Sequence, residues 1–409
     1  MKIGSGKLIH GNTLDILRRM NSNSVDLIVT SPPYYALRKY PDEANVEWND
    51  GTHCQLGLEP TPELYVEHLG LILKELYRVL RPTGIFFLNI GDSYSGSMGK
   101  RAGWSYISNL GNKKDGTAIH HRASYDLPRK CLLCIPERVL FKCLEIGFIL
   151  RNKIIWYKSS HLPGSQKDRF TTSWEYIYMF VKKPKDYYFN LDAVREKYNE
   201  VTIERIKKFI KNQEHFDPQK HKHGDFGGQQ PFEILENVVK SAIGGSGRFW
   251  SWQRKVGRKL DLLENPTGFT RKRHSGYFSE NGELLIDLRG KTPSDLWVIT
   301  SEPLKEYHFA HFPKKLVARC LACGCPPDGV VLDPFIGSGT TGLVAELFNT
   351  KQFDKIPKID EVTNIDVVKE IDWNIGWIGI DIVSEYIEMT KRRILGEVYS
   401  HSRKLTELT

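Results

Sequence analysis

Two prolines and a tyrosine follow an apolar run near the start of the chain. Residues 25–29, V-D-L-I-V, have the apolar character of a buried strand, and T-S-P-P-Y-Y follows at 30–35. Proline fixes φ and has no backbone N–H, so Pro32 and Pro33 predict a rigid ridge of carbonyl acceptors with no competing donor. Tyr34 adds a ring that can lie flat on something planar. An amino group attached to a flat base is a substrate that suits such a ridge.

A glycine turn near the other end of the chain could bind a second ligand. The apolar run 330–333 leads into D-P-F-I-G-S-G-T-T at 333–341. Glycines let the backbone approach a ligand closely, and the N–H groups at a helix start can receive a carboxylate. The G-x-x-x-x-G-K of a nucleotide P-loop and the third glycine of a dinucleotide fingerprint are both missing. Asp381, at the tip of the next predicted strand, is placed to accept from two ribose hydroxyls.

Alternating strand and helix patterns must position these motifs. Apolar runs predict strands at 7–10, 25–29, 84–90, 149–157, 174–181, 295–299, 330–333 and 377–381. Helical spacing predicts helices at 13–20, from Thr61 to Arg81, at 136–146, 312–323 and 340–348, and from Ser384. The pattern indicates an α/β protein: a doubly wound, mostly parallel sheet with helices on both faces and ligands at the carboxyl ends of the strands. Residues 91–130 are expected to be a long loop over the site, and 349–376 receive no predicted function.

The positive charge of the chain is concentrated in one segment. The 409 residues carry a net charge of +9, and 195–275 alone hold 17 Lys and Arg against 10 Asp and Glu. Basic side chains for phosphates, interleaved with aromatic side chains for bases, suit a nucleic-acid-reading insertion, although a solvated lysine-rich helical face has the same composition. The nucleic-acid-binding residues expected are Arg248, Trp250, Trp252, Arg254, Lys255, Arg258, Lys259, Arg271, Lys272 and Arg273.

The cysteines and the amino terminus bear on compartment and metals. The chain starts without a secretion signal and has no apolar run near the roughly 20 residues of a membrane span, so we expect a cytoplasmic protein with no membrane contact and reduced cysteines. Cys131-x-x-Cys134 and Cys320-x-x-Cys323 have metal-ligand spacing. Both pairs lie in or beside apolar, helix-patterned segments, which favours small buried hydrophobes over a zinc site. No metal is therefore expected.

Taken together, three motifs resemble those of the S-adenosylmethionine-dependent DNA amino-methyltransferases, in their circularly permuted β group. They are T-S-P-P-Y at 30–34, D-P-F-I-G-S-G-T-T at 333–341 and G-I-D at 379–381, and shorter segments at 55–59, 78–82, 88–92 and 309–313 are also similar. The resemblance implies a Rossmann-like class I methyltransferase fold. Its catalytic half would be 1–194, its basic target-recognition insertion 195–290 and its cofactor half 291–409.

The resemblance also implies S-adenosyl-L-methionine as cofactor and double-stranded DNA as substrate. The target base would be flipped from the duplex onto Tyr34, and the Ser31 hydroxyl and Pro32 carbonyl would accept from its exocyclic amine. The amine would then take the methyl group in one displacement. The catalytic residues expected are Ser31, Pro32, Pro33 and Tyr34. The cofactor-binding residues expected are Asn12, Phe312, Asp333, Phe335, Gly337, Ser338, Gly339, Thr340, Thr341 and Asp381.

Position 31 bears on the target base, while Asn12, Trp174 and a longer stretch at 349–376 depart from the usual family pattern. Serine at 31, where adenine-specific relatives more often carry aspartate or asparagine, favours N4 of cytosine and leaves N6 of adenine as the alternative. Asn12 follows Gly11 where the family often has aspartate, which leaves its role at the adenine ring open. Trp174 stands where histidine is frequent. The sequence does not define the DNA site, a restriction endonuclease partner, or the choice between monomer and homodimer.

Other function classes fit less well. Glu236-Asn237-Val238 matches a short motif of the cytosine C5 methyltransferases, but that chemistry needs a cysteine nucleophile, usually after proline, and none of the seven cysteines follows a proline. An inactive nucleic-acid-binding relative would not need the intact run from Ser31 to Tyr34. A methyltransferase for structured RNA is disfavoured because the whole-chain layout resembles DNA-modifying relatives.

Overall fold

The computed structural model describes residues 1–96, 127–160, 166–198, 290–301 and 313–400. The chain divides into one unit of Met1–Val194 with Pro293–Thr409 and a second unit of Arg195–Thr292. All of the predicted nucleic-acid-binding residues, Phe312 and most of the predicted loop 91–130 lie outside the described residues. The described part of the first unit contains the proline loop and the glycine turn.

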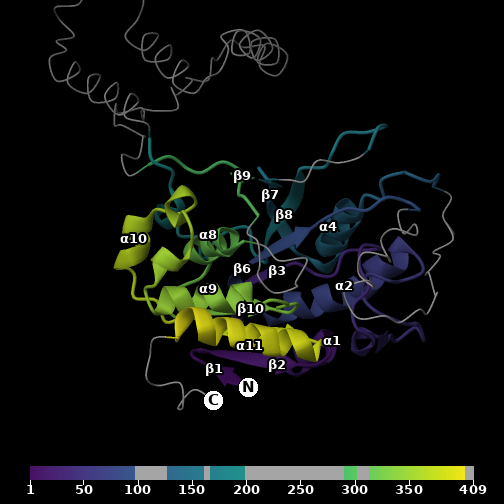
Figure 1. Ribbon diagram of the computed structural model, residues 1–409, viewed down its shortest axis with the longest axis horizontal. Helices are drawn as coiled ribbons and strands as arrows, with labels where there is room; N and C mark the ends of the chain where they lie inside the picture. Colours follow the sequence, from purple (N-terminus) through teal and green to yellow (C-terminus); the bar gives the residue numbers. More distant parts are fainter. Residues whose placement is uncertain (97–126, 161–165, 199–289, 302–312, 401–409) are drawn as a thin grey trace, which may run out of the picture. The chain divides into compact units, whose positions relative to one another are not determined.

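Among the described residues, nine strands of the first unit form one sheet in the order β1-β2-β11-β10-β3-β6-β8-β7-β9 (Figure 1). They are β1 (Lys2–Ile3), β2 (Gly6–His10), β3 (Val25–Thr30), β6 (Leu80–Ile90), β7 (Ile149–Tyr157), β8 (Trp174–Val181), β9 (Leu296–Val298), β10 (Val330–Asp333) and β11 (Gly376–Asp381). A separate small sheet pairs β4 (Val46–Glu47) with β5 (His53–Cys54).

Most neighbouring strands are parallel. The central run from β2 through β11, β10 and β3 to β6 is parallel, and so is the pair of β7 and β9. β8 runs antiparallel to both β6 and β7, and β1 runs antiparallel to β2. β7 and β8 are consecutive strands that pair with each other directly, which an antiparallel arrangement allows without a helical crossover. The mostly parallel α/β sheet predicted from the sequence is confirmed.

Helices cover both faces of this sheet, as predicted. They are α1 (Thr13–Arg19), α2 (Pro62–Val79), α4 (Ile135–Ile146), α8 (Lys314–Gly324), α9 (Thr340–Asn349), α10 (Ile365–Glu370) and α11 (Ser384–Val398). Leu27 and Phe87 face a buried cluster with α8, α9, α10 and α11, while Ile28 and Phe86 face a second cluster with α1, α2 and α4. Both central strands are therefore buried on two sides, which explains their nearly continuous apolar sequences.

The ends of the elements follow local signals in the sequence. Helix α2 begins as predicted, with Pro62 in its first turn and the Thr61 hydroxyl accepting from the Leu64 N–H at 3.1 Å. Strand β6 begins at Leu80 instead of the predicted residue 84, because Leu80 already pairs with Val25 before an irregularity in the ladder. No described helix is both long and apolar enough to cross a membrane.

The stretch 349–376, which has no predicted function, forms part of the core. It contains α10 and the short turns η3 (Phe353–Lys355) and η4 (Ile359–Glu361). Its apolar side chains are buried in the cluster with α8 and α9, among them Phe353, Ile359 and Trp373. Two further short turns are η1 (Asp42–Ala44) and η2 (Asp192–Val194).

The cysteine pairs differ from one another. Cys320 and Cys323 are buried in α8, as expected of small apolar residues. Cys134 is exposed and Cys131 is half-buried, so the interpretation as buried hydrophobes is wrong for this pair. The reason is position: both precede α4 on a strand-like segment at the surface instead of lying within the helix.

The buried carboxylate of Glu346 in α9 joins three distant segments. It accepts from the backbone N–H and hydroxyl of Ser5 at 2.8 Å, from the Trp377 indole at 2.7 Å and from the Tyr399 hydroxyl. We predict that Glu346→Ala lowers the free energy of unfolding by about 3 kcal/mol, because the buried Trp377 indole and the donors of Ser5 and Tyr399 lose their acceptor. Urea unfolding measures it. Glu388→Ala, exposed on α11, is the control and should change stability by less than about 0.5 kcal/mol. Equal stability of the two variants would contradict the assignment.

Candidate active site

A buried carboxylate joins the carboxyl ends of β3 and β10. Asp333, the last residue of β10, accepts from the Thr30 hydroxyl at 2.7 Å and from the Thr341 hydroxyl at 2.7 Å. The Phe335 N–H also donates to it, at 3.1 Å. Burial raises the pKa of Asp333 to about 6, although these hydrogen bonds act to lower it. Because Thr30 leads into the proline loop and Thr341 follows the glycine turn, Asp333 holds the two motifs together.

The glycine turn curls around a second carboxylate. Gly337 and Gly339 have φ values of 50° and 80°, in the left-handed region that glycine adopts without strain. Asp381, at the end of β11, accepts from the Gly337 N–H and the Val383 N–H, each at 2.9 Å. Burial raises the pKa of Asp381 to about 6, against the lowering effect of these two backbone donors. The turn is thus fixed with its carboxylate beside it.

Hydrogen bonds from α2 and from the segment before it fix the proline loop on its buried side. The Tyr65 hydroxyl donates to the Pro33 carbonyl at 2.9 Å, and the Ala36 N–H donates to the Gly57 carbonyl at 2.8 Å. Gly57 has a φ of 93°, and a Cβ there would lie 2.8 Å from the Tyr34 carbonyl oxygen, so the loop approaches too closely for any side chain. The carbonyl ridge predicted from the sequence is therefore fixed by contacts on its buried side.

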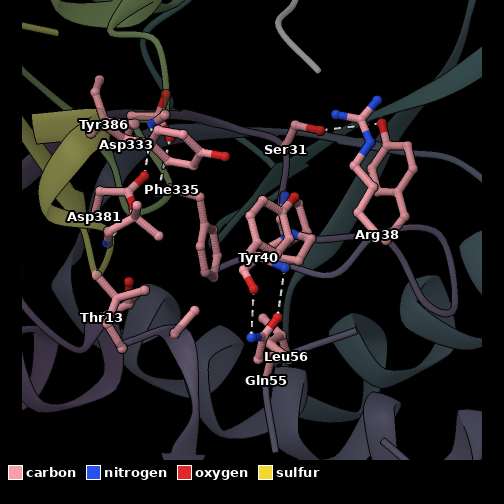
Figure 2. Close-up of a pocket in the computed structure, with 18 of the residues that line it drawn as sticks. Thr13, Ser31, Arg38, Tyr40, Gln55, Leu56, Asp333, Phe335, Asp381 and Tyr386 are labelled. Carbon is pink, nitrogen blue, oxygen red and sulfur yellow. Dashed lines mark hydrogen bonds between the residues drawn. The ribbon is translucent and has the colours of Figure 1, made fainter. Parts of the chain in front are cut away.

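Both motifs open into one cavity of about 330 Å³. Figure 2 shows Asp333, Asp381 and Phe335 on one side of it, with Ser31 across from them. The predicted residues that line this cavity are Asn12, Ser31, Pro32, Pro33, Tyr34, Asp333, Phe335, Gly337, Ser338, Thr340 and Asp381. Gly339 and Thr341 do not line the cavity. Gly339 immediately precedes α9, and the Thr341 hydroxyl donates to Asp333. The proline loop and the glycine turn, which are far apart in the sequence, therefore lie at the same cavity.

Asn12 lines the cavity and also begins a helix. Its side-chain oxygen accepts from the Leu14 N–H at 2.8 Å, which caps α1, and the neighbouring Thr13 hydroxyl donates to the Pro334 carbonyl at 2.7 Å. An amide oxygen performs this capping as well as a carboxylate does. The asparagine that departs from the usual family pattern therefore has a structural role at the cavity wall.

Several lining residues were not predicted from the sequence. Lys158 follows the end of β7, Glu175 lies at the start of β8, and Tyr386 lies in the first turn of α11. Asn89, which lies in one of the segments similar to the family, is buried at the end of β6 and also lines the cavity. Lys158 and Glu175 are single polar residues at strand ends with no motif around them, so no local signal in the sequence identifies them.

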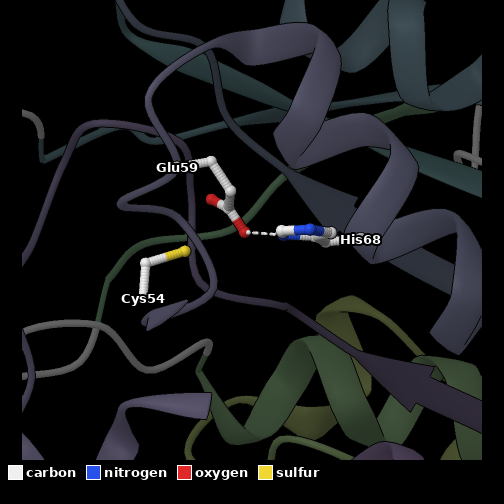
Figure 3. A group of neighbouring side chains, drawn as sticks. All are labelled: Cys54, Glu59 and His68. Atoms are coloured by element: carbon white, nitrogen blue, oxygen red, sulfur yellow. Dashed lines mark hydrogen bonds and ion pairs between the residues drawn. The ribbon is translucent and has the colours of Figure 1, made fainter. Parts of the chain in front are cut away.

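Beside the proline loop, buried His68 and Glu59 form a group of ionisable side chains with the exposed Asp50. His68 Nδ1 is 3.1 Å from Glu59 Oε1 (Figure 3). Its Nε2 is 3.2 Å from Asp50 Oδ2, and its ring stacks on the Trp48 ring with the two centroids 4.0 Å apart. Glu59, fully buried, also accepts from the Gly57 N–H at 2.8 Å. Burial alone would lower the pKa of His68, but the hydrogen bonds to the two carboxylates outweigh it and raise that pKa. Through its hydrogen bond to Glu59, His68 thus supports the contact between Gly57 and the proline loop.

Two clusters in the described part of the chain have spacing that a metal ion could use: Cys54 with Glu59 and His68, and Asp92 with Cys134 and Glu137. In the first, Glu59 and His68 bond each other. In the second, Asp92 accepts from the backbone N–H groups of Cys134 and Ile135 at the start of α4, at 3.1 and 3.0 Å. Helix capping and ion pairing account for the polar contacts that these carboxylates make.

A DNA methylase family model, that of the N6/N4 methyltransferases, matches residues 25–247 and 248–392. The chain belongs to this family. It is 30% identical to the Type II methyltransferase M.SfiI of Streptomyces fimbriatus over 387 residues, which cover 82% of this chain and 84% of that protein. It is 27% identical to M.Cfr9I of Citrobacter freundii over 398 residues, covering 97% and 90%.

Solved structures of DNA methyltransferases are also similar to this chain. One is the PvuII DNA methyltransferase, described as cytosine-N4-specific, with 16% identity, a TM-score of 0.49 and coverage of 100% of this chain and 92% of that one. The resemblance predicted from the proline and glycine motifs is confirmed by the family match. The protein is a DNA methyltransferase of the N6/N4 family, and its proline motif precedes its glycine motif in the sequence.

The support behind the proline loop of this methyltransferase predicts a pH-dependent stability. A histidine whose pKa is raised by folding contributes stability below its unfolded pKa, and this contribution is lost as pH rises through the folded pKa. His68→Leu should therefore lower the free energy of unfolding by about 3 kcal/mol at pH 6, leaving Glu59 without its partner, and by less at pH 9. Urea unfolding at both pH values measures the difference. A loss that is equal at pH 6 and pH 9 would show that the charge of His68 contributes nothing.

Proposed function

We propose that this methyltransferase transfers a methyl group from S-adenosyl-L-methionine to the exocyclic N4 of cytosine in duplex DNA. It would act in the cytoplasm as the modification enzyme of a Type II restriction-modification system, beside a cognate endonuclease. One observation carries the proposal: the Ser31–Tyr34 loop and the Gly337–Thr340 turn face a single cavity. A methyl acceptor and a methyl donor can thus meet there. The Type II names of the relatives support the biological setting.

The donor set of the glycine turn fits the cofactor. Asp381 is a carboxylate at the cavity wall and would accept from ribose hydroxyls, while Phe335 offers a flat ring for the adenine. Backbone N–H groups at the start of α9, from Ser338 to Thr340, would receive the carboxylate of the methionine part. When bound, S-adenosyl-L-methionine supplies an electrophilic methyl group on a sulfonium.

The proline loop would prepare the acceptor. The lone pair of an exocyclic amine is delocalised into the base, so the amine attacks poorly until hydrogen bonds draw its N–H groups out of plane. The Ser31 hydroxyl and the Pro32 carbonyl would accept those two bonds, and the ring of Tyr34 would stack on the flipped base. Positioning then supplies most of the rate enhancement, without a covalent enzyme intermediate. Serine at 31 favours cytosine because adenine-specific relatives more often carry aspartate or asparagine.

The basic segment would hold the DNA. Residues 195–275, with 17 Lys and Arg against 10 Asp and Glu, contain the residues that we expect to bind the duplex outside the target-base pocket, from Arg248 to Arg273. Such contacts release counterions, so DNA binding should weaken steeply with salt.

Nucleoside mass spectrometry of genomic DNA from cells expressing the protein tests the base assignment. We expect N4-methylcytosine, and we expect Pro32→Ala to reduce it because the acceptor ridge loses its rigidity. Detection of N6-methyladenine alone would overturn the cytosine assignment and keep the family. Purified protein with labelled methyl donor, offered duplex DNA or structured RNA, provides the second test. Transfer to RNA alone would reject DNA as the substrate.

Protonation of Asp381 should weaken cofactor binding. Its pKa near 6 means that the ionised form, which accepts hydroxyl hydrogen bonds best, is lost as pH falls through that value. We predict that S-adenosyl-L-methionine binds about tenfold more weakly at pH 5 than at pH 8. In Asp381→Asn, binding should be weaker at pH 8 and nearly independent of pH. Equilibrium binding measures both. A pH dependence that persists in the variant would assign the titration to Asp333 instead.

A further inference from the structure

A chain of hydrogen bonds runs from the catalytic serine to a carboxylate at the cavity wall. The Ser31 hydroxyl donates to the Tyr34 oxygen at 3.2 Å. The Tyr34 hydroxyl lies 3.0 Å from Glu175 Oε2 and 3.0 Å from Asn89 Oδ1. Ser31, Tyr34, Asn89 and Glu175 all line the cavity. The far end of this chain lies on β6 and β8, outside the proline loop.

The chemistry of the end groups fixes the direction of every bond in the chain. An ionised carboxylate only accepts, and Asn89 turns its amide oxygen toward Tyr34 because its nitrogen donates to Glu175 at 3.2 Å and to the Tyr176 carbonyl at 3.0 Å. The single proton of the Tyr34 hydroxyl is therefore donated toward Glu175 and Asn89. The Tyr34 oxygen can then only accept from Ser31, and the lone pairs of Ser31 are left for the cavity.

We propose that Glu175, acting through the Tyr34 hydroxyl, is a positioning residue that makes Ser31 a hydrogen-bond acceptor for the amine of the target base. This rests on the proposed function of the same cavity. A free serine hydroxyl donates as readily as it accepts, and one that turned its proton toward an amine would oppose the N–H group that it must receive. Directing that proton to Tyr34 removes this unproductive orientation before the base arrives.

The surroundings hold the Glu175 side chain in place and keep the Tyr34 hydroxyl protonated. Lys158 forms an ion pair with Glu175 on the side away from Tyr34, and its Nζ lies 4.6 Å from the centre of the Trp156 ring. Burial, together with the nearby charge of Glu175, raises the pKa of Tyr34 well above its ordinary value, so its hydroxyl keeps a proton to donate. Gly91 leaves room for the ring, since a Cβ there would lie 2.5 Å from Tyr34 Cε2.

The hydrogen-bond chain from Ser31 through Tyr34 to Glu175, which we call the relay, is tested by a double-mutant cycle in which kcat is measured. Tyr34→Phe keeps the ring and removes the hydroxyl, and we expect kcat for labelled-methyl transfer to duplex DNA to fall about tenfold. Dissociation constants for DNA and S-adenosyl-L-methionine should stay within about twofold. In a Ser31→Ala background, where the Pro32 carbonyl still supports residual transfer, Tyr34→Phe should have no further effect on kcat. Glu175→Gln should behave in the same way.

Tyr65→Phe is the matched control. It removes another tyrosine hydroxyl that contacts the same loop, the donor to the Pro33 carbonyl, but it has no path to the Ser31 hydroxyl. Any loss that it causes should be the same with Ser31 and with Ala at position 31. The relay is overturned if Tyr34→Phe has wild-type kcat, or if its fractional loss is unchanged in the Ser31→Ala background. Wild-type protein that transfers no methyl group to duplex DNA would instead reject the proposed function, and the relay with it.

Discussion

The site depends on the hydrogen bonds that the buried Asp333 carboxylate accepts from Thr30 and Thr341. These residues belong to the two ends of a long chain, and each stands beside one of the two motifs. A buried carboxylate is costly unless it is well bonded, and its raised pKa reflects that cost. Because the cost is offset only when both hydroxyls are in place, the carboxylate favours the one arrangement in which the proline loop and the glycine turn meet. Assembly of the cavity and stability of the sheet are therefore linked.

The proline loop is held by contacts from several elements. The Tyr65 hydroxyl reaches it from α2, the Gly57 carbonyl from the segment before α2, and the Asn89 and Glu175 side chains from β6 and β8. None of these groups lies within the loop itself. Such support suits the proposed reaction, which would rely on positioning the target amine. The same supports explain why the loop tolerates two adjacent prolines, which cannot donate backbone hydrogen bonds of their own.

Most of the fold could be predicted from the sequence because the central strands are buried on both faces. Runs such as 25–29 and 330–333 must then be almost wholly apolar, and the helix that starts at Thr61 carries its own capping signal. The antiparallel direction of β8 could not be predicted, since an apolar run does not encode which neighbour it will join. The burial of residues 349–376 in the core could not be predicted either, because the apolar residues of this stretch follow no regular helix or strand period.

The motif residues of the candidate site were predictable and their partners were not. Ser31, Asp333 and Asp381 lie in runs with strong local signals, whereas Glu175 and Lys158 are single polar residues that reach the cavity only through the pairing of β7 with β8. Asn89 lies beside Glu175 because of the pairing register of β6 with β8, and this register could not be predicted from the sequence.

The carboxylate of Glu346 has an implication for the history of such chains. Ser5 and Tyr399 bond the same side chain, so segments near opposite ends of the described sequence are spatial neighbours. A short linker between neighbours of this kind would leave every strand in place, and new ends could then open at a surface connection elsewhere. Gene rearrangement can thus change the order of the two halves in the sequence, while the fold and the cavity shared by the two motifs stay the same.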